Sequence, residues 1–278
     1  MAVRVVTDST ADLPPDLARE WGIEVIPLFV HFGTEVYRDG LDMGPNEFYQ
    51  RLVRSPRLPT TSAPPPGAFQ EVYARLLEGA EGVVSVHISS KLSATHDSAL
   101  LAGQQFKGKI EVIDSLSCSM GVGLLALAAA ERARGRKKLK EIAQEVRALV
   151  PRAHLFGLVD TLDYLVKGGR VGKAQAFLGS LLQVKPLLTI KHGEAHPLER
   201  VRTRRRALER LVELAASFSS ASALAVLSST TPQEAEALAG RLGKGFACPI
   251  YQARFGPVMG TYVGPGALGV ALIGEARP

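Results

Sequence analysis

Short apolar runs alternate with amphipathic stretches over the first 150 residues, and this pattern predicts alternating strands and helices. The runs expected to form strands lie at residues 3–7, 23–32, 82–89 and 109–114. Gly33-Thr34 can turn the second run into a hairpin, and Pro14-Pro15 opens a helix to about Trp21 with Asp12 placed to cap it. The alternation indicates an α/β layer with a mainly parallel sheet.

An amphipathic helix ends near Val150, where Pro151 stops it, and we place a domain boundary there. The sequence thus predicts an N-terminal domain over residues 1–151 and a C-terminal domain over residues 152–278. In the second domain we expect a hairpin that turns at His192-Gly193. Further strands are expected at 154–159, 223–228 and 267–273, and further helices from the Gly-rich loop to about 183, at 204–218 and at 231–242.

The composition is that of a folded protein, with 46% hydrophobic and 22% charged residues among 278. The net charge of +6 favours an anionic partner only weakly and does not indicate nucleic acid. Cys118 and Cys248 lie far apart without a CxxC spacing, so neither a disulfide framework nor a zinc site is expected. Asn46 is the only asparagine, a depletion that fits a hot habitat or a GC-rich genome.

The apolar segments are too short for a membrane span. The first ten residues, MAVRVVTDST, are too polar for a signal peptide. The most apolar window, residues 121–130, is far shorter than the ~20 residues that cross a bilayer. We therefore expect a soluble, cytoplasmic protein.

Several catalytic and cofactor motifs can be tested and set aside. Neither a Gly-x-Ser-x-Gly elbow nor a Walker A loop occurs. Gly264–Gly269 matches the dinucleotide pattern, but only nine residues follow it, which is too few for a βαβ unit. His192, Glu194 and His196 could share one strand face, yet the first belongs to a turn signal and no fourth ligand is near. We expect no metal and no cofactor.

Two hydroxyl-rich clusters precede predicted helices, at residues 60–62 and 89–95. The simplest interpretation is helix capping, because Ser and Thr satisfy the free N–H groups of a first helical turn. Two such clusters can also converge on one anion, which helix N-termini favour. The clusters alone leave both interpretations open.

Motifs spread in order over nearly the whole chain narrow the choice. They are Asp8-Ser-Thr-Ala-Asp-Leu13, Thr61-Ser-Ala-Pro64, Ser89-Ser-Lys-Leu-Ser-Ala-Thr95, Ile113-Asp-Ser115, Leu165-Val-Lys-Gly-Gly-Arg-Val-Gly-Lys173, Val184-Lys-Pro186, Val201-Arg-Thr-Arg204 and Gly264-Pro-Gly-Ala-Leu-Gly269. Together they resemble the DegV family of bacterial fatty-acid-binding proteins. The resemblance implies a two-domain α/β fold of the DegV type, with a mainly parallel sheet in the N-terminal domain and a mixed sheet in the C-terminal domain.

The resemblance also implies a ligand and a role. A long-chain fatty acid such as palmitate would be buried, with its carboxylate bound by Thr61 and Ser93 and with Ser62 adjacent. The family delivers this acid to a fatty acid kinase, which forms the acyl phosphate used in phospholipid synthesis. The chain would then be a carrier without catalysis of its own.

This sequence departs from the family pattern at three positions. Pro65 stands where the family usually has Ser, and Ala94 stands where it often has Gly. Tyr262 replaces a characteristic His shortly before Gly-Pro-Gly, so any role of that histidine near the head group is in doubt. Tyr262 and Arg170 are the candidates for the surroundings of the head group.

Five arginines occur within residues 200–206, at the start of a predicted helix. They can form a solvated helix start, although positive charge there is electrostatically unfavourable. Our preferred interpretation is docking of an acidic partner surface, with Arg202 as its representative. Two other functions stay open: a phosphotransferase or kinase-like enzyme, and a nucleic-acid-binding regulator, which the small charge disfavours.

Overall fold

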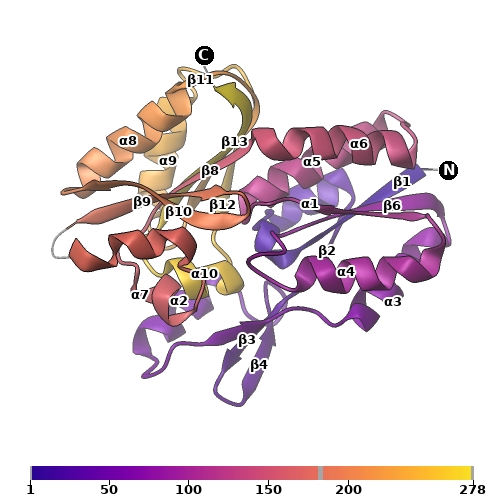
Figure 1. The fold of residues 1–278 in the computed structure, drawn as a ribbon, viewed down its shortest axis with the longest axis horizontal. Coiled ribbons are helices and arrows are strands. Elements are labelled where there is room, and N and C mark those ends of the chain that lie inside the picture. Colours follow the sequence, from indigo (N-terminus) through magenta and orange to yellow (C-terminus); the bar gives the residue numbers. More distant parts are fainter. Residues whose placement is uncertain (1, 181–183, 277–278) are drawn as a thin grey trace.

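Three β-sheets organise the chain, which a computed structural model describes over residues 2–180 and 184–276 (Figure 1). The first sheet has the strand order β2-β1-β6-β7, and all its pairs are parallel. Its strands are β1 (Ala2–Asp8), β2 (Ile23–Ile26), β6 (Ala80–His87) and β7 (Ile110–Asp114). The parallel pairing confirms the predicted layer. The Val- and Ile-rich sequences of these strands fit burial of both faces of the sheet.

Helices cover both faces of this sheet. One face packs against α5 (Met120–Arg134) and α6 (Leu139–Leu149), and the other against α3 (Pro66–Leu77) and α4 (Thr95–Gly103). Adjacent residues of β6 show the division, because Val84 joins the core beneath α5 whereas Val83 joins the core of α3 and α4. The helix α1 (Pro15–Trp21) packs beside β2.

The second sheet is mixed, as expected from the family resemblance. Its strand order is β10-β9-β8-β13-β11-β12, in which only the β11–β12 pair is parallel. The strands are β8 (Ala153–Leu158), β9 (Lys185–Lys191), β10 (Glu194–Val201), β11 (Phe218–Ser228), β12 (Ile250–Arg254) and β13 (Leu268–Ala276). Helices α8 (Arg204–Ala216) and α9 (Pro232–Leu242) cover one face, and α5 packs against the sheet as well.

A small antiparallel sheet carries the order β4-β3-β5 and lies at the bottom of Figure 1. It consists of β3 (Phe29–Phe32), β4 (Glu35–Arg38) and β5 (Thr60–Ser62), next to α2 (Pro45–Arg54). The turn at Gly33-Thr34 is confirmed. The single strand predicted over 23–32 is wrong, because Pro27 and Leu28 separate β2 from β3, and Pro27 has no N–H to continue a ladder.

Some irregular elements differ from the predictions. The segment Gly172–Ser180 (η4) forms 3₁₀ turns rather than the start of an α-helix, and residues 181–183 lie outside the described residues. The pattern also missed β12 and the short helix α10 (Pro257–Val263). The remaining short elements are η1 (Ser9–Ala11), η2 (Gln104–Phe106), η3 (Val150–Arg152) and α7 (Asp163–Lys167).

Asp12 does not cap α1, so that prediction is wrong. The N-cap position is Pro14, which makes no side-chain cap bond. Asp12 has a left-handed backbone with φ of 51°, and its buried carboxylate accepts hydrogen bonds from the Ser119 hydroxyl and from the Gly256 N–H at 2.8 Å. The carboxylate therefore joins η1 to the first turns of α5 and α10.

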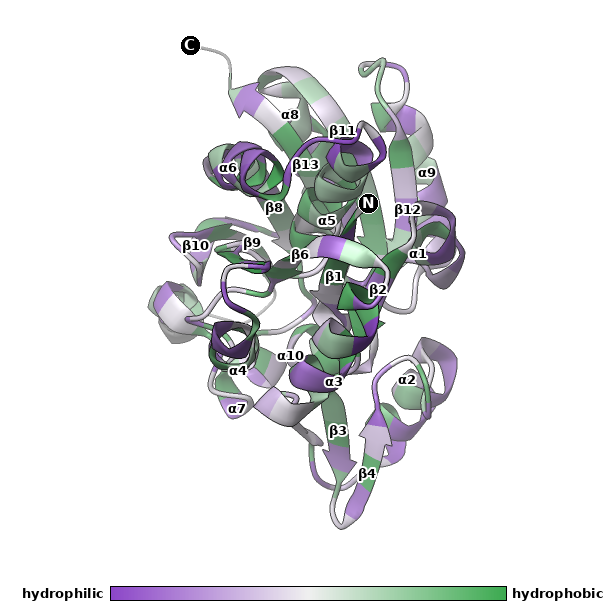
Figure 2. Ribbon diagram, turned by 90° about the vertical axis from the view of Figure 1, so that its right-hand side faces the viewer, coloured by the Kyte–Doolittle hydropathy of each residue, from purple (hydrophilic) through white to green (hydrophobic). Residues whose placement is uncertain are grey.

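One continuous apolar core connects the two large sheets. It contains Val5 of β1, Leu125 of α5 and Ala271 of β13, and Figure 2 shows these inner elements as predominantly hydrophobic. Pro151 lies in η3, between the last helix on the parallel sheet and the first strand of the mixed sheet. A division into domains at 151 therefore separates the two large sheets. Because both sheets share one core, the division remains a proposal.

Within residues 2–180 and 184–276, none of the helices combines the length and the apolar character needed to cross a membrane.

Candidate functional site

A cavity lies where the three sheets meet, and most of its wall is apolar. Its lining comes from segments far apart in the chain, including β5, β8, β9 and α10. The apolar side chains are Leu28, Ala63, Ile88, Leu92, Ala94, Cys118, Leu155, Val159, Leu165, Leu188, Ile190, Ala195, Phe255, Val258, Met259 and Val263. Such a lining can hold a hydrocarbon chain away from water.

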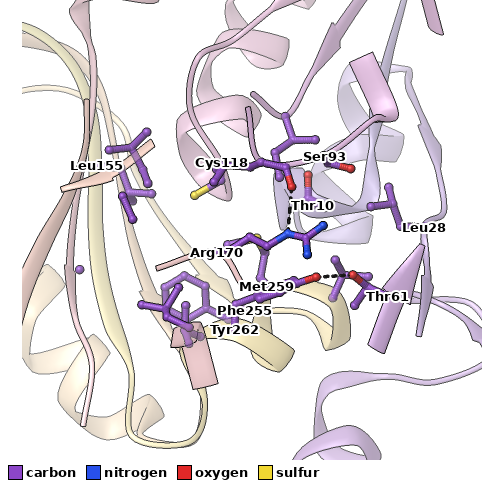
Figure 3. Close-up of a pocket in the computed structure, with 18 of the residues that line it drawn as sticks. Thr10, Leu28, Thr61, Ser93, Cys118, Leu155, Arg170, Phe255, Met259 and Tyr262 are labelled. Atoms are coloured by element: carbon purple, nitrogen blue, oxygen red, sulfur yellow. Dashed lines mark hydrogen bonds between the residues drawn. The ribbon is translucent and has the colours of Figure 1, made fainter. Parts of the chain in front are cut away.

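Polar side chains also line the same cavity (Figure 3). Thr61, Ser93, Arg170 and Tyr262 come from β5, from the turn before α4, from the loop after α7, and from α10. The structure thus brings together four of the residues that the sequence predicted for the head group. In Figure 3 the Leu155 and Cys118 side chains lie to the left of Thr61 and Leu28, on the far side of Arg170.

Thr61 and Tyr262 are directly hydrogen-bonded. The alternation of side chains along β5 directs Thr61 toward α10, and its Oγ1 lies 2.5 Å from the Tyr262 hydroxyl. One hydroxyl donates to the other, so one of their two protons is left free for a ligand. Tyr262 therefore positions the Thr61 hydroxyl.

Ser93 is held by the turn that joins β6 to α4. Its N–H donates to the Ser89 carbonyl at 3.1 Å, and its Oγ accepts from the Thr95 N–H at 3.3 Å. Ser89 in turn donates to the Gly193 carbonyl of the β9–β10 hairpin at 2.8 Å. The turn is therefore fixed to the mixed sheet, and the Ser93 hydroxyl keeps a position at the cavity wall.

Arg170 lies at the exposed end of the cavity. Its Nε–H donates to the Leu92 carbonyl at 3.3 Å and its Nη1–H to the Gly168 carbonyl at 3.0 Å. Its guanidinium carbon is 5.4 Å from the centre of the Tyr262 ring. These contacts hold a permanent positive charge beside the two hydroxyl-bearing segments.

The first hydroxyl cluster does not cap a helix. Residues 60–62 form the strand β5, and α3 begins after Pro65 without a side-chain cap. Ser62 lines the cavity, but its hydroxyl lies 2.9 Å from Nε2 of His31 on β3. Only the second cluster stands at a helix start, where Ala94 occupies the N-cap position of α4 without a side-chain cap bond. The interpretation as two helix N-termini that converge on one anion therefore does not hold for the first cluster.

Thr10, which was not predicted as a site residue, also lines the cavity. Its backbone N–H and its hydroxyl both donate to Oδ1 of Asp8, at 3.0 Å for the N–H. The hydroxyl proton of Thr10 is therefore used within the protein, and its oxygen can only accept from a ligand. In the sequence, only the position of Thr10 in the Asp-Ser-Thr motif indicated that it could be a site residue.

Asp8 belongs to a buried array with the geometry of a Ser–His–Asp triad. His87 Nδ1 lies 2.8 Å from Asp8 Oδ2, and His87 Nε2 lies 2.6 Å from the Ser85 hydroxyl. Ser85 also accepts from the Tyr73 hydroxyl at 2.8 Å. All four side chains are fully buried and none lines the cavity, so no substrate there can reach Ser85. The array ties β1, β6 and α3 together.

Cys118 is a lining residue and a poor nucleophile. Burial, together with the nearby carboxyl of Asp12, raises the pKa of its thiol to about 12. It remains protonated at neutral pH and acts as part of the apolar wall.

Arg202 does not line the cavity, and most of the arginine cluster around it is paired. Arg204 contacts Glu234 at 2.6 Å and Asp160 at 3.0 Å, and Arg206 contacts Glu213 at 2.8 Å. The helix start is therefore largely neutralised by its own neighbours. Among the described residues Arg202 is exposed and has no ion-pair partner.

The described part of the chain holds no group of three His, Cys, Asp or Glu side chains that could bind a metal ion. The pair His192-Gly193 forms the turn between β9 and β10, as the pattern predicted.

A family model described as "uncharacterised protein, DegV family" matches residues 2–275. The chain belongs to the DegV family. A DegV domain-containing protein of Streptomyces coelicolor is 41% identical over 97% of this chain and 98% of its own length. The DegV fold is confirmed by two solved structures, which are described as fatty-acid-binding DegV proteins.

The first, from Thermus thermophilus, has a TM-score of 0.92 at 36% identity and covers 99% of this chain and 100% of its own. The second, from Bacillus subtilis, has a TM-score of 0.90 at 34% identity with the same coverage.

Proposed function

We propose that this DegV protein binds one long-chain fatty acid in the cavity, with the tail against the apolar wall and the carboxylate at Thr61 and Ser93. The observation that carries the proposal is the junction of an apolar wall with these hydroxyls, at the positions of the family motifs, in a single cavity. The description of two close structural relatives as fatty-acid-binding proteins supports it.

Burial of the tail supplies most of the binding free energy. About fifteen carbons at ~0.8 kcal/mol each give roughly 12 kcal/mol before the cost of association, which takes back several kcal/mol. The cavity has a volume of about 200 Å³. Met259 and Arg170 are long, flexible side chains in its wall, which can adjust to the shape of a bound chain.

The polar residues set the orientation of the acid. The free proton of the Thr61–Tyr262 pair can donate to a carboxylate oxygen. The Ser93 hydroxyl can donate as well when the Thr95 hydroxyl, 2.8 Å away, donates to it. Neutral donors hold a carboxylate without neutralising it, and Arg170 at the exposed end can add a charged donor. We infer that a carboxylate held in this way stays nucleophilic enough to accept a phosphoryl group.

Presentation to a fatty acid kinase requires that the carboxylate end be reachable. Ser93, Ala94 and Arg170 line both the cavity and an adjacent open polar cleft that also includes Lys91 and Glu194. A kinase active site could approach through this cleft and form the acyl phosphate used for phospholipid synthesis. In this proposal the chain is a cytoplasmic carrier and the partner performs the chemistry.

Neither alternative function gains support from a specific observation. A kinase-like enzyme would need clustered metal-binding carboxylates, which the described residues do not provide, and the Ser85 array is closed to substrate. A nucleic-acid-binding surface would need free cations, whereas much of the arginine cluster is paired with acidic side chains.

Titration of the delipidated protein with palmitate tests the proposed function. We expect saturable binding of about one equivalent, and we expect protein expressed in bacteria to release a comparable amount of fatty acid on organic extraction. Protein that carries no lipid and shows no affinity for palmitate or oleate would refute the proposal.

Arg202 tests the docking part of the proposal. Arg202 follows the last residue of β10, whereas Glu194, which lines the polar cleft, is the first residue of that strand. In an extended strand the two residues are therefore roughly 25 Å apart. Arg202→Glu should therefore leave palmitate binding intact and slow acyl-phosphate formation, and added salt should slow the wild type likewise. Arg241→Glu, on the exposed side of α9, is the matched control. Equal rates for wild type and Arg202→Glu at low salt would rule out docking at this residue.

A further inference from the structure

A second cleft shares a wall with the fatty-acid cavity. In three pairs of consecutive residues, the first residue lines the second cleft and the next lines the fatty-acid cavity. The pairs are Ser9 and Thr10, Pro27 and Leu28, and Pro257 and Val258. The second cleft has a volume of about 540 Å³, within the range of small-molecule sites. None of the residues assigned to the fatty acid lines it.

The walls of this cleft are rigid and apolar, apart from a few polar groups. Six of its lining residues are prolines, which present carbon surface without a backbone N–H. The prolines are Pro14, Pro15, Pro27, Pro45, Pro232 and Pro257, and the polar residues are Ser9, Asp12, Asp39, Ser228, Gln252 and Arg254.

Two buried carboxyl groups face each other across Gly256. Asp12 is 8% exposed and Asp39 is 5% exposed. Their Oδ1 atoms lie 3.1 and 3.2 Å from the point that a side-chain carbon on Gly256 would occupy. Two carboxylates this close and this buried need a cation or a proton between them.

The protein itself does not supply that cation. Asp12 accepts from neutral donors only, the Ser119 hydroxyl and the Gly256 N–H. Oδ2 of Asp39 is buried without a hydrogen-bond partner among the described residues. Arg254 lines the cleft, but its two Nη groups donate to the Asn46 side chain and to the Ser229 carbonyl, the latter at 3.0 Å, and its Nε–H has no partner among the described residues. Across residues 2–180 and 184–276 neither acid forms an ion pair with Lys or Arg.

The titration of Asp39 reflects these surroundings. Burial raises the pKa of Asp39 to about 7. This effect outweighs the lowering of the pKa by the Ser9 side chain and the Val258 N–H. Asp8 adds to the increase by its negative charge. Burial also raises the pKa of Asp12 well above its usual value. The other charged or titratable groups near this region are Tyr49 from α2, Arg254 from β12 and the Cys118 thiol, which lies beside Asp12.

We propose that this cleft is a second ligand site, which takes a small aliphatic amine with its ammonium group between Asp39 and Asp12 and its carbon chain against the prolines. After a small shift that opens Oδ2 of Asp39 to the cleft, an ammonium group donates the hydrogen bonds that this oxygen lacks and neutralises the acid pair. A metal ion fits less well, because the described residues offer no third acidic or imidazole ligand beside the pair.

Calorimetric titration of the full chain with n-pentylamine, in amine-free buffer at pH 7, tests the site. We expect saturable binding of one equivalent that n-pentanol does not reproduce, and palmitate should not compete. Because an ammonium group favours the ionised form of Asp39, binding should release protons, which two buffers of different ionisation enthalpy can measure.

Substitutions of lining residues test whether the amine binds in this cleft. Asp39→Asn should weaken amine binding at least tenfold and abolish much of the proton release. The control Asp42→Asn alters an acid already paired with Arg38 and should change nothing. Gln252→Arg adds a repelling cation at an exposed lining position and should also weaken binding, independently of any effect of Asp39→Asn on folding.

Absence of saturable heat, equal binding of n-pentanol, or an unchanged affinity in Asp39→Asn would overturn the second site. Competition by palmitate would overturn it too, since the amine would then occupy the fatty-acid cavity. Palmitate binding by the wild type is measured separately, so failure of the second site leaves the proposed fatty-acid function unaffected.

Discussion

Thr61 and Tyr262 are 201 positions apart in the chain, yet their hydroxyl oxygens are 2.5 Å apart at the cavity. Tyr262 stands where the family resemblance implies a histidine. A tyrosine hydroxyl can both donate and accept, so it can orient Thr61 and still leave a proton for a carboxylate. The substitution at this position is therefore compatible with an acid-binding site of neutral donors.

Removal of single hydroxyls tests the orientation of the fatty acid. Thr61→Val and Ser93→Ala should each weaken palmitate binding by about 1–2 kcal/mol, or roughly 5- to 30-fold in Kd, because each removes one hydrogen bond to a charged group. The double variant should still retain lipid through the tail, while kinase-dependent phosphorylation falls further.

Thr60→Val is the matched control for Thr61→Val. Thr60 is the preceding residue of β5, it is exposed, and it does not line the cavity. If Thr60→Val weakened palmitate binding as much as Thr61→Val does, the loss would reflect damage to the strand and not a missing contact to the carboxylate. The measurement is fluorescence or calorimetric titration with palmitate.

At the scale of the element, the short helix α10 connects the mixed sheet to the small sheet. It packs against α2 and against β3 and β5, and it carries Val258, Met259 and Tyr262 into the cavity wall. This close approach depends on Gly260. A side-chain carbon there would lie 2.6 Å from the Phe48 ring and 2.7 Å from the Tyr49 hydroxyl.

Gly260→Ala should therefore displace α10 from α2. Both aromatic side chains are buried and cannot move aside, so we expect a loss of stability of about 1–3 kcal/mol, together with weaker palmitate binding. Urea unfolding and palmitate titration measure the two effects. The control is Gly240→Ala in α9, where no atom lies within 4 Å of the added carbon.

The control should be neutral or stabilising by about 0.5–1 kcal/mol, because alanine favours the helix over glycine. If Gly260→Ala behaved like Gly240→Ala, α10 would not be seated against α2 as the structure places it.

At the scale of the whole molecule, the three sheets meet at Gly256, where Asp12 and Asp39 approach from two directions. The pKa of Asp39 is raised on folding from its ordinary value of 3.8 to about 7. Between these pH values the folded chain holds a proton that the unfolded chain has released. The associated stability is fully present below about pH 3.8 and is lost as the pH rises through 7.

Asp39→Asn removes this pH dependence. The unfolding free energy of the variant relative to the wild type should increase by about 2–3 kcal/mol between pH 5 and pH 8, since one pKa unit corresponds to about 1.4 kcal/mol. Urea unfolding in amine-free buffers measures it. Asp42→Asn should show no such change, because contacts with Arg38 hold the pKa of Asp42 at about 2, below this range. Parallel pH profiles for wild type and Asp39→Asn would contradict the assignment.

The sequence by itself determined most strands and helices, the turns at Gly33-Thr34 and His192-Gly193, and the family. Strand and helix periods, turn residues and short motifs are local properties, so a linear chain displays them. Thr61, Ser93 and Arg170 could be named for the same reason, since each lies inside a motif.

Only the tertiary structure decided how these pieces combine. The contact of Thr61 with Tyr262, the bridge from Asp12 to α5 and α10, and the split of residues 23–32 between two sheets all depend on partners distant in the sequence. Arg204 looked like free charge at a helix start because Glu234 and Asp160, which neutralise it, lie 30 and 44 positions away. Hydrogen bonds and ion pairs act over a few ångströms in space, and chain separation does not reveal which side chains folding brings within that range.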